Sequence, residues 1–235
     1  MAAFRAGVAA GATHLELDVH ATRDGRIVVL HDATLDRTTD AIGAVKDRDW
    51  AAVMEADAGA RFVDSSGAAP YAGCGVRIPL LEEVLAEFPE VALNVEVKQA
   101  RPEIVPDVVA LVNRYHAADR VLLAAESQAI MNDIRREYGG PTGSSADEVL
   151  EFYRRSIEDD MTGYRPPGVA LQVPPSHDGV EVVTEKFVAD AHRAGVEVHV
   201  WTINEAAEMR RLLGLGVDGI MSDFPALAAE VLAGA

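Results

Sequence analysis

The chain has one cysteine, few basic residues and no long apolar run, and each shortage excludes a class of protein. A lone Cys74 excludes an internal disulfide framework and every cysteine-rich metal site, which fits a reducing compartment. Lysine and arginine number 21 against 38 acidic residues, and the formal charge of −17 excludes a basic surface for nucleic acid. No apolar run reaches transmembrane length, and the first residues lack the regions of a signal peptide. We therefore expect a cytoplasmic protein that neither inserts stably into membranes nor binds nucleic acid.

The remaining composition is that of a well-cored globular protein, with 49% hydrophobic and 25% charged residues in a chain of 235. A barrel of eight β/α units has about 250 residues, so the chain is slightly short of one. Short β-rich runs alternate with amphipathic helical stretches almost to the end, which predicts an α/β protein with a mainly parallel sheet. The predicted strands are 13–19, 26–32, 91–98, 120–126, 168–173, 196–203 and 217–223, with a weak eighth at 141–145.

The predicted helices carry capping signals at several ends. Asn204 precedes one helix as a candidate N-cap, and Gly195 and Gly216 follow the last turns of two others. Residues 33–78 break the alternation and predict a long insertion after the second strand, of a kind that is often functional. No linker divides the chain, so we expect one domain over 1–235. The predicted helices span 1–10, 80–88, 102–116, 127–138, 146–160, 184–195, 204–216 and 225–234.

Two strands combine an apolar face with a chemically reactive one. In the first strand, Glu16 and Asp18 share a face with two histidines, while leucine and valine fill the other. A surface strand with its polar face in water would show the same alternation, so this pattern alone leaves both interpretations open. The run 91–98 repeats it, with Glu96 and Lys98 on one face near the carboxyl end. Barrel enzymes place their active sites at that end, so the repetition favours a functional site.

Glu16, Asp18 and Glu96 are candidate metal ligands. Three carboxylates that converge at one end of a sheet repel one another, and their pKa values rise unless a cation neutralises them. Carboxylate oxygens without cysteine indicate a hard divalent ion, Mg²⁺ or Ca²⁺. The sequence therefore predicts one divalent cation held by these three residues.

His31 is a candidate general acid or base. An Asp24-Gly25 pair between the first two strands favours a tight turn, and a hairpin about that turn would bring His31 roughly opposite Asp18. Separate parallel strands would also place both residues near carboxyl ends. A histidine beside a metal and carboxylates can transfer protons near neutral pH. The simpler interpretation, favoured when His31 is considered alone, is that it and Asp32 cap the following turn.

Five segments together resemble the glycerophosphodiester phosphodiesterases in content, order and spacing. The resemblance covers essentially the whole chain and implies a TIM-type (β/α)8 barrel with a small insertion after the His-Asp strand. It implies that Glu16, Asp18 and Glu96 hold Ca²⁺ or Mg²⁺, that His31 is an acid–base group, and that Lys98 lies close to the phosphate. The segments are ELDVHATRDGRIVVLHDATLDRTT (16–39), IPLLEEVL (78–85), LNVEVK (93–98), VHVWTIN (198–204) and GVDGIMSDFP (216–225).

The sequence departs from the family pattern at its beginning. Members begin with a strand that carries His-Arg-Gly, whose histidine is the second acid–base residue and whose arginine binds phosphate, and this chain has no such tripeptide. We therefore expect a barrel that lacks its first strand and a chain that is truncated at the N-terminus relative to the family. The loss of one acid–base group typically costs about 10²–10⁴-fold in rate, so we expect the family activity to be very weak or absent.

Two further residues have open assignments, and one has none. The resemblance places Trp201 in the pocket, where it would pack against glycerol or head-group carbons, while an ordinary core tryptophan is an equally good interpretation. Asp223 ends the last strand and either lines the pocket or caps the helix that begins at Pro225. Glu126 stands where many relatives have a different type of run, and we assign it no role.

The leading hypothesis is metal-dependent hydrolysis of a glycerophosphodiester to sn-glycerol 3-phosphate and an alcohol. A second hypothesis keeps the barrel and the metal and changes the substrate to a lysophospholipid or a sphingomyelin-type diester. Apolar residues in the 33–78 insertion would support it, but the segment is mostly small and polar, so this hypothesis ranks lower. A third hypothesis is a degenerate, non-catalytic barrel, since a missing strand leaves unpaired edges.

Overall fold

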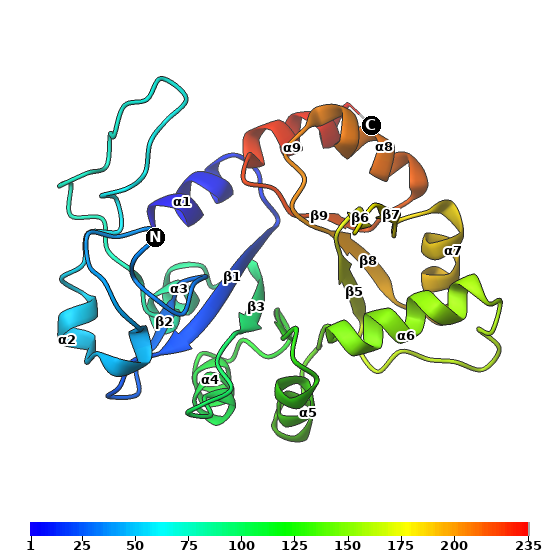
Figure 1. Cartoon of the computed structure of the whole chain (residues 1–235), viewed down its shortest axis with the longest axis horizontal. Helices are drawn as coiled ribbons and strands as arrows, with labels where there is room; N and C mark the ends of the chain where they lie inside the picture. Colours follow the sequence, from blue (N-terminus) through cyan, green and yellow to red (C-terminus); the bar gives the residue numbers. More distant parts are fainter. Residues whose placement is uncertain (235) are drawn as a thin grey trace.

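The structure is a computed structural model that describes residues 1–234, with the strands in the interior and the helices around them (Figure 1). The strands are β1 (His14–Ala21), β2 (Ile27–Val29), β3 (Ala92–Val97), β4 (Val121–Ala124), β5 (Ala170–Val173), β6 (Ser176–His177), β7 (Val180–Glu181), β8 (Glu197–Val200) and β9 (Gly219–Ile220). The α-helices are α1 (Ala2–Ala9), α2 (Trp50–Val53), α3 (Leu81–Glu87), α4 (Val105–Arg114), α5 (Gln128–Glu137), α6 (Ala146–Ile157), α7 (Glu185–Ala194), α8 (Ala206–Leu215) and α9 (Pro225–Ala233), and one 3₁₀ helix spans Val45–Asp47.

The main strands run parallel in the order β1-β3-β4 and β5-β8-β9. Single bridges at Thr142 and Gly143 join β4 to β5, so the weak eighth strand expected at 141–145 exists only as this contact. β2 pairs antiparallel with the end of β1, which makes the hairpin interpretation correct. The alternation of strands and helices thus gives the TIM-type barrel that the sequence predicted. Within residues 1–234 no ladder joins β9 to β1, and the ring of strands is open between them.

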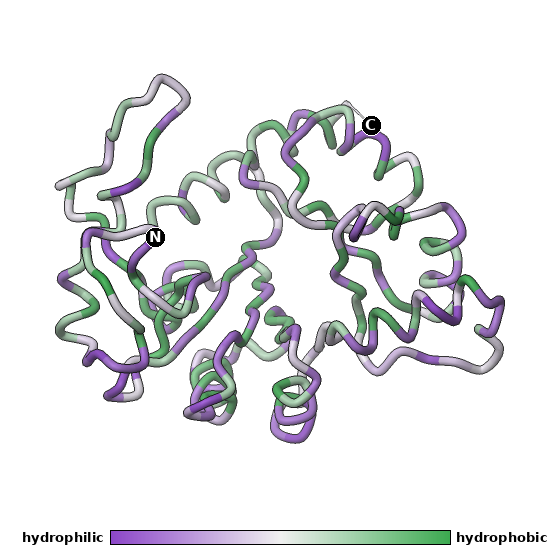
Figure 2. Tube along the Cα trace, in the orientation of Figure 1, coloured by the Kyte–Doolittle hydropathy of each residue, from purple (hydrophilic) through white to green (hydrophobic). Residues whose placement is uncertain are grey.

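The apolar faces of the strands pack outward against the helices. Leu15, Leu17 and Val19 of β1 join the buried side chains of β3, β4 and helices α3 to α5 in one cluster. A second cluster joins β5 and β8 to helices α6 to α9. In Figure 2, β5 and β8 are mostly hydrophobic, while the helices around them alternate between hydrophilic and hydrophobic residues. Side chains alternate between the two faces of a strand, and the apolar face of β1 packs against the helices. The polar residues of β1 therefore face the interior of the barrel.

The insertion has a small apolar core of its own. Val45, Val53 and Ile78 are buried together with residues of β2 and with Leu35. This core holds the 3₁₀ helix and α2 against the start of the barrel, although the composition of 33–78 gave no regular pattern. The segment between α2 and α3 projects away from the rest of the chain as the long cyan loop of Figure 1.

Two of the three capping predictions are confirmed. Gly195 and Gly216 end α7 and α8 in the left-handed conformation, with φ of 79° and 87°. The prediction for Asn204 is wrong, because the N-cap of α8 is Glu205 and the Asn204 side chain bonds to Asp223 instead. In the part of the chain that the structure describes, no helix combines the length and apolar character needed to cross a membrane.

Candidate active site

Glu16, Asp18 and Glu96 form one acidic cluster, which we call the acidic triad. Asp18 of β1 and Glu96 of β3 are direct partners in the parallel register, and Glu16 lies two residues earlier on the same face of β1. One carboxylate oxygen from each residue lies within 4.8 Å of the other two. The predicted metal ligands are therefore brought together, and the parallel pairing of β1 with β3 is the physical reason.

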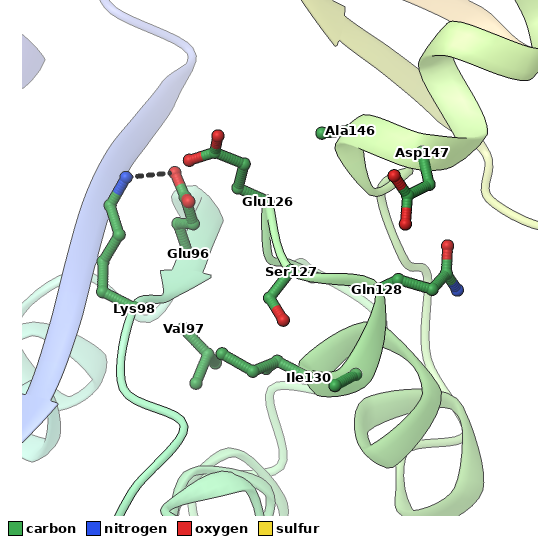
Figure 3. Close-up of a pocket in the computed structure, with 10 residues that line it drawn as sticks. Glu96, Val97, Lys98, Glu126, Ser127, Gln128, Ile130, Ala146 and Asp147 are labelled. Atoms are coloured by element: carbon green, nitrogen blue, oxygen red, sulfur yellow. Dashed lines mark ion pairs between the residues drawn. The ribbon is translucent and has the colours of Figure 1, made fainter.

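Lys98 is the cation of this cluster. Its Nζ lies 2.9 Å from Glu96 Oε2, the ion pair drawn in Figure 3, and 3.2 Å from Asp18 Oδ1. Burial lowers the Lys98 pKa, but the bonds and charges of Glu96 and Asp18 outweigh burial and leave the pKa above its ordinary value. Lys98 is therefore protonated and compensates part of the charge of the acidic triad.

Glu16 shows that this compensation is incomplete. Part of its side chain is exposed, yet its carboxyl group is crowded by protein. This crowding raises the Glu16 pKa first, and the charges of Asp18 and Glu96 raise it further, to about 8. Lys98 opposes the shift, and Asp223 adds a small increase. Without another cation, one of the three acids therefore stays protonated at neutral pH.

The acidic triad fits a hard divalent cation. Three carboxylates from two adjacent strands supply oxygen ligands, which Mg²⁺ and Ca²⁺ prefer. Burial first, and then the charges of Asp18 and Glu96, raise the Glu16 pKa, and a divalent ion bound at the acidic triad would favour the ionised form of Glu16.

His31 is held by an acid rather than by a turn. Its Nδ1–H donates to Asp32 Oδ1 at 2.8 Å, and Arg37 donates to the same carboxylate at 2.7 and 2.8 Å. The Arg37 and His31 side chains together hold the pKa of Asp32 well below its usual range. The Asp32 carboxylate thus orients an exposed imidazole and leaves its Nε2 free for proton transfer. The structure favours this arrangement over the turn cap.

Two residues that the sequence analysis did not single out support the same region. His20 is buried, and burial lowers its pKa, so the neutral ring donates its Nε2–H to the carbonyl of His31 at 3.2 Å. Gln99 is buried after β3 and accepts from the backbone N–H of Ala21 at 3.2 Å. Both residues tie the ends of neighbouring strands together. Nothing in local sequence indicates such long-range bonds.

Trp201 and Asp223 lie beyond the ends of β8 and β9. Trp201 is 43% exposed, which excludes the interpretation as an ordinary core tryptophan. Asp223 does not cap α9, whose N-cap is Phe224, and it accepts a bond from Asn204 Nδ2 at 2.9 Å. Asp223 follows β9, and its negative charge is the smallest of the contributions that raise the Glu16 pKa.

Comparison with known proteins assigns the chain to a family. The model of the Glycerophosphoryl diester phosphodiesterase family matches residues 1–227. Among curated proteins, the chain is 32% identical over 237 residues to the "Probable glycerophosphodiester phosphodiesterase 2" of Mycobacterium tuberculosis, and the match covers 99% of this chain and 84% of that protein.

Two solved structures share the fold. A glycerophosphoryl diester phosphodiesterase domain from Mycobacterium tuberculosis superimposes with a TM-score of 0.86 at 20% identity and covers 97% of this chain and 91% of that one. A phosphodiesterase of Oleispira antarctica, solved in complex with the product sn-glycerol-3-phosphate, has a TM-score of 0.78 at 22% identity and covers 98% and 89%. At these identities the two structures support the fold alone.

Proposed function

The chain belongs to the glycerophosphoryl diester phosphodiesterase family, and we propose that it hydrolyses glycerophosphodiesters to sn-glycerol 3-phosphate and an alcohol. The observation that carries this proposal is the acidic triad beside Lys98 at the carboxyl ends of β1 and β3. A negatively charged phosphodiester would not approach three carboxylates without added positive charge. We also propose that residues 1–235 act as one domain, with 33–78 as its insertion.

We propose that Glu16, Asp18 and Glu96 hold one divalent cation, Ca²⁺ or Mg²⁺. Such an ion supplies Lewis acidity at a phosphate oxygen when it is bound. Glu16 would have to be ionised to act as a ligand, and the charge of the ion would oppose the burial and the neighbouring acids that raise its pKa. Lys98 contacts one oxygen each of Asp18 and Glu96, so the ion would either take the second oxygen of each carboxylate or displace the ammonium group.

The side chains of Lys98, His31 and Trp201 divide the remaining tasks. Lys98, once displaced from the carboxylates, is a cation that can pair with the phosphate oxygens. His31 can accept or donate a proton at Nε2 while Asp32 stabilises its charged form. Exposed Trp201 presents an apolar face to the carbons of the glycerol or the head group.

We propose further that hydrolysis by the 235-residue chain is slow. His31 supplies one acid–base group, and the sequence has no His-Arg-Gly tripeptide to supply a second group together with a phosphate-binding arginine. The absence of one such group costs about 10²–10⁴-fold in rate. A version extended at its N-terminus by a His-Arg-Gly strand is expected to be faster by at least that factor.

The test is release of glycerol 3-phosphate from sn-glycero-3-phosphocholine by both versions, with and without EDTA. We expect release that EDTA abolishes and that Glu96→Gln removes, while Glu90→Gln, an exposed acid outside the acidic triad, retains it. Equal, high activity of the two versions would refute the impairment. No release by either version would refute the hydrolase proposal and leave a non-catalytic barrel.

One observation favours a second substrate class, the lysophospholipids. Phe62, Val63 and Tyr71 in the projecting loop are 49%, 58% and 44% exposed, although the composition of the insertion gave no reason to expect an apolar surface. Exposed apolar side chains of this kind can contact a lipid aggregate. We expect that Phe62→Ser with Val63→Ser would lower hydrolysis of micellar lysophosphatidylcholine more than that of glycerophosphocholine. Equal effects on both substrates would remove this candidate.

A further inference from the structure

A cavity of about 530 Å³ opens beside the acidic triad, between the ends of β3 and β4 and the starts of α5 and α6 (Figure 3). Glu96 belongs to the acidic triad and also lines the cavity, as does its ion-pair partner Lys98. A ligand bound at the triad can therefore extend into the cavity. The other lining residues are Val97, Glu126, Ser127, Gln128, Ala129, Ile130, Ala146 and Asp147.

The walls of the cavity are fixed by bonds between the two helix starts. Ser145 Oγ donates to Gln128 Oε1 at 2.6 Å, and the Ser145 hydroxyl also accepts from the Glu148 N–H at 3.2 Å as the N-cap of α6. Arg135 of α5 donates to Glu148 at 2.8 Å, and the Ala146 N–H donates to the Glu126 carbonyl at 3.0 Å. The end of β4 and the starts of α5 and α6 therefore form a wall of the cavity that hydrogen bonds hold in place before any ligand binds.

The charge of this wall is negative. Lys98 is paired with Glu96 and Asp18, and Arg135 is paired with Glu148. Glu126 and Asp147 form no ion pair within the described chain, residues 1–234. They reach the cavity from different elements, Glu126 from the end of β4 next to Glu96 and Asp147 from the first turn of α6 (Figure 3). The cavity is thus bordered by two carboxylates whose negative charge no ion-pair partner among the described residues offsets.

We propose that this cavity receives the alcohol arm of the substrate and that Glu126 and Asp147 select head groups with a positive charge. The inference rests on the proposed hydrolase function. A phosphodiester has two arms, and the cavity, which shares Glu96 with the acidic triad, gives one of them a space of about 530 Å³. A neutral glycerol arm gains no charge attraction in the cavity, whereas an ammonium group does. The cationic arm therefore lies against Glu126 and Asp147.

The expected preference is modest, because both carboxylates are exposed. An exposed pair of opposite charges typically contributes about threefold in an equilibrium constant, and two such factors multiply to about tenfold. Salt screens exposed charges, so the preference should shrink as ionic strength rises. For a diester of similar size with an uncharged head group, the contribution of the head group to binding should not depend on salt.

The test measures binding rather than turnover, so it does not depend on a fast reaction. Dissociation constants of sn-glycero-3-phosphocholine and of glycerophosphoglycerol are measured by calorimetry in the presence of Mg²⁺ or Ca²⁺, and their ratio is the readout. Glu126→Gln with Asp147→Asn should reduce the preference for the choline diester about tenfold. The matched control is Glu90→Gln with Asp107→Asn, since Asp107 is also an acid in the first turn of a helix, α4, and lies outside the cavity.

The same ratio in parent and doubly neutralised protein, or no measurable binding of either diester by the parent, would overturn the inference. A ratio that falls equally in the control would show a general charge effect and would overturn it too. Hydrolysis of both diesters by the parent is measured separately. If the parent hydrolyses both diesters but the ratio of dissociation constants is the same in parent and variant, the head-group assignment is refuted and the hydrolase function stands. If the parent prefers the choline diester in binding but hydrolyses neither, the hydrolase function is refuted and the cavity remains a binding site for cationic head groups.

Discussion

Lys98 Nζ lies 2.9 Å from Glu96 Oε2. In this position the ammonium group offsets part of the negative charge of the acidic triad when no metal is bound. Both side chains are mostly shielded from solvent, with exposed fractions of 23% each. The pairing makes Lys98 and a divalent cation competitors for the negative charge of the same two carboxylates. Four predictions follow from this competition and from the other ion pairs of the chain.

Lys98→Gln should destabilise the metal-free protein. Asp18 and Glu96 then lack their partner, and an unpaired, partly buried acid costs about 1–3 kcal/mol. Saturating Ca²⁺ or Mg²⁺ should shrink the difference in Tm between variant and parent, because the metal replaces the lost cation. Thermal unfolding with and without metal checks this. A difference in Tm that metal leaves unchanged would speak against ligation by Asp18 and Glu96.

Metal affinity should rise with pH. With a pKa of about 8, Glu16 keeps its proton at neutral pH and must lose it to become a ligand. Affinity is therefore expected to increase about tenfold per unit of pH below 8 and to level off above it. Calorimetry in buffers of different ionisation enthalpy should detect about one released proton. In Glu16→Gln both the pH dependence and the proton release should disappear, with weaker binding at pH 8.5.

Asp32→Asn should lower kcat more than it raises KM. The amide can still contact His31, but it no longer stabilises the charged imidazole, so we expect about a 10- to 100-fold loss of kcat. Steady-state kinetics of parent and variant separate kcat from KM. Asp47→Asn, at an exposed acid of the insertion, is the control. An unaltered kcat in Asp32→Asn would show that Asp32 does not act through His31.

Asp190 should contribute to stability near neutral pH and lose that contribution in acid. Burial raises its pKa, but bonds from Lys186 Nζ at 2.8 Å and Ser156 Oγ at 2.6 Å outweigh burial and hold the pKa below its ordinary value. An acid with a depressed folded-state pKa stabilises the fold above its unfolded pKa of about 4, and the benefit falls away as pH drops through the folded value.

Asp190→Asn should therefore lower the free energy of unfolding at pH 7 by about 1–3 kcal/mol and reduce the steepness of acid unfolding. Urea unfolding at pH 7 and pH 3 measures both effects. Asp133→Asn, at a partly exposed acid of α5 with one arginine partner, serves as control and should change little. An equal loss at the two pH values would mean that Asp190 acts by packing and not by charge.

The local sequence predicts the elements well, because alternation with a period of two and caps such as Gly195 are short-range features. It fails where a side chain has a distant partner. Asn204 reads as an N-cap from its neighbours, but its partner is Asp223, nineteen residues away and on the next strand end. The strand predicted at 26–32 is shortened to Ile27–Val29, the three residues that pair with the end of β1.

The sequence by itself determined the alternation of strands and helices, the residues of the acidic triad, the family resemblance and the strong negative charge. Those properties reside in residue types and their spacing, which need no partner. Only the tertiary structure decided that Lys98 lies on Asp18 and Glu96, that Arg37 and Asp32 hold His31, and that a cavity with two unpaired acids opens beside them. The contact of Lys98 with Asp18 and the cavity join segments far apart in the chain, and they exist because parallel pairing brings the carboxyl ends of the strands to one rim. The bonds among His31, Asp32 and Arg37 are close in sequence, but they depend on how the segment after β2 folds back on itself.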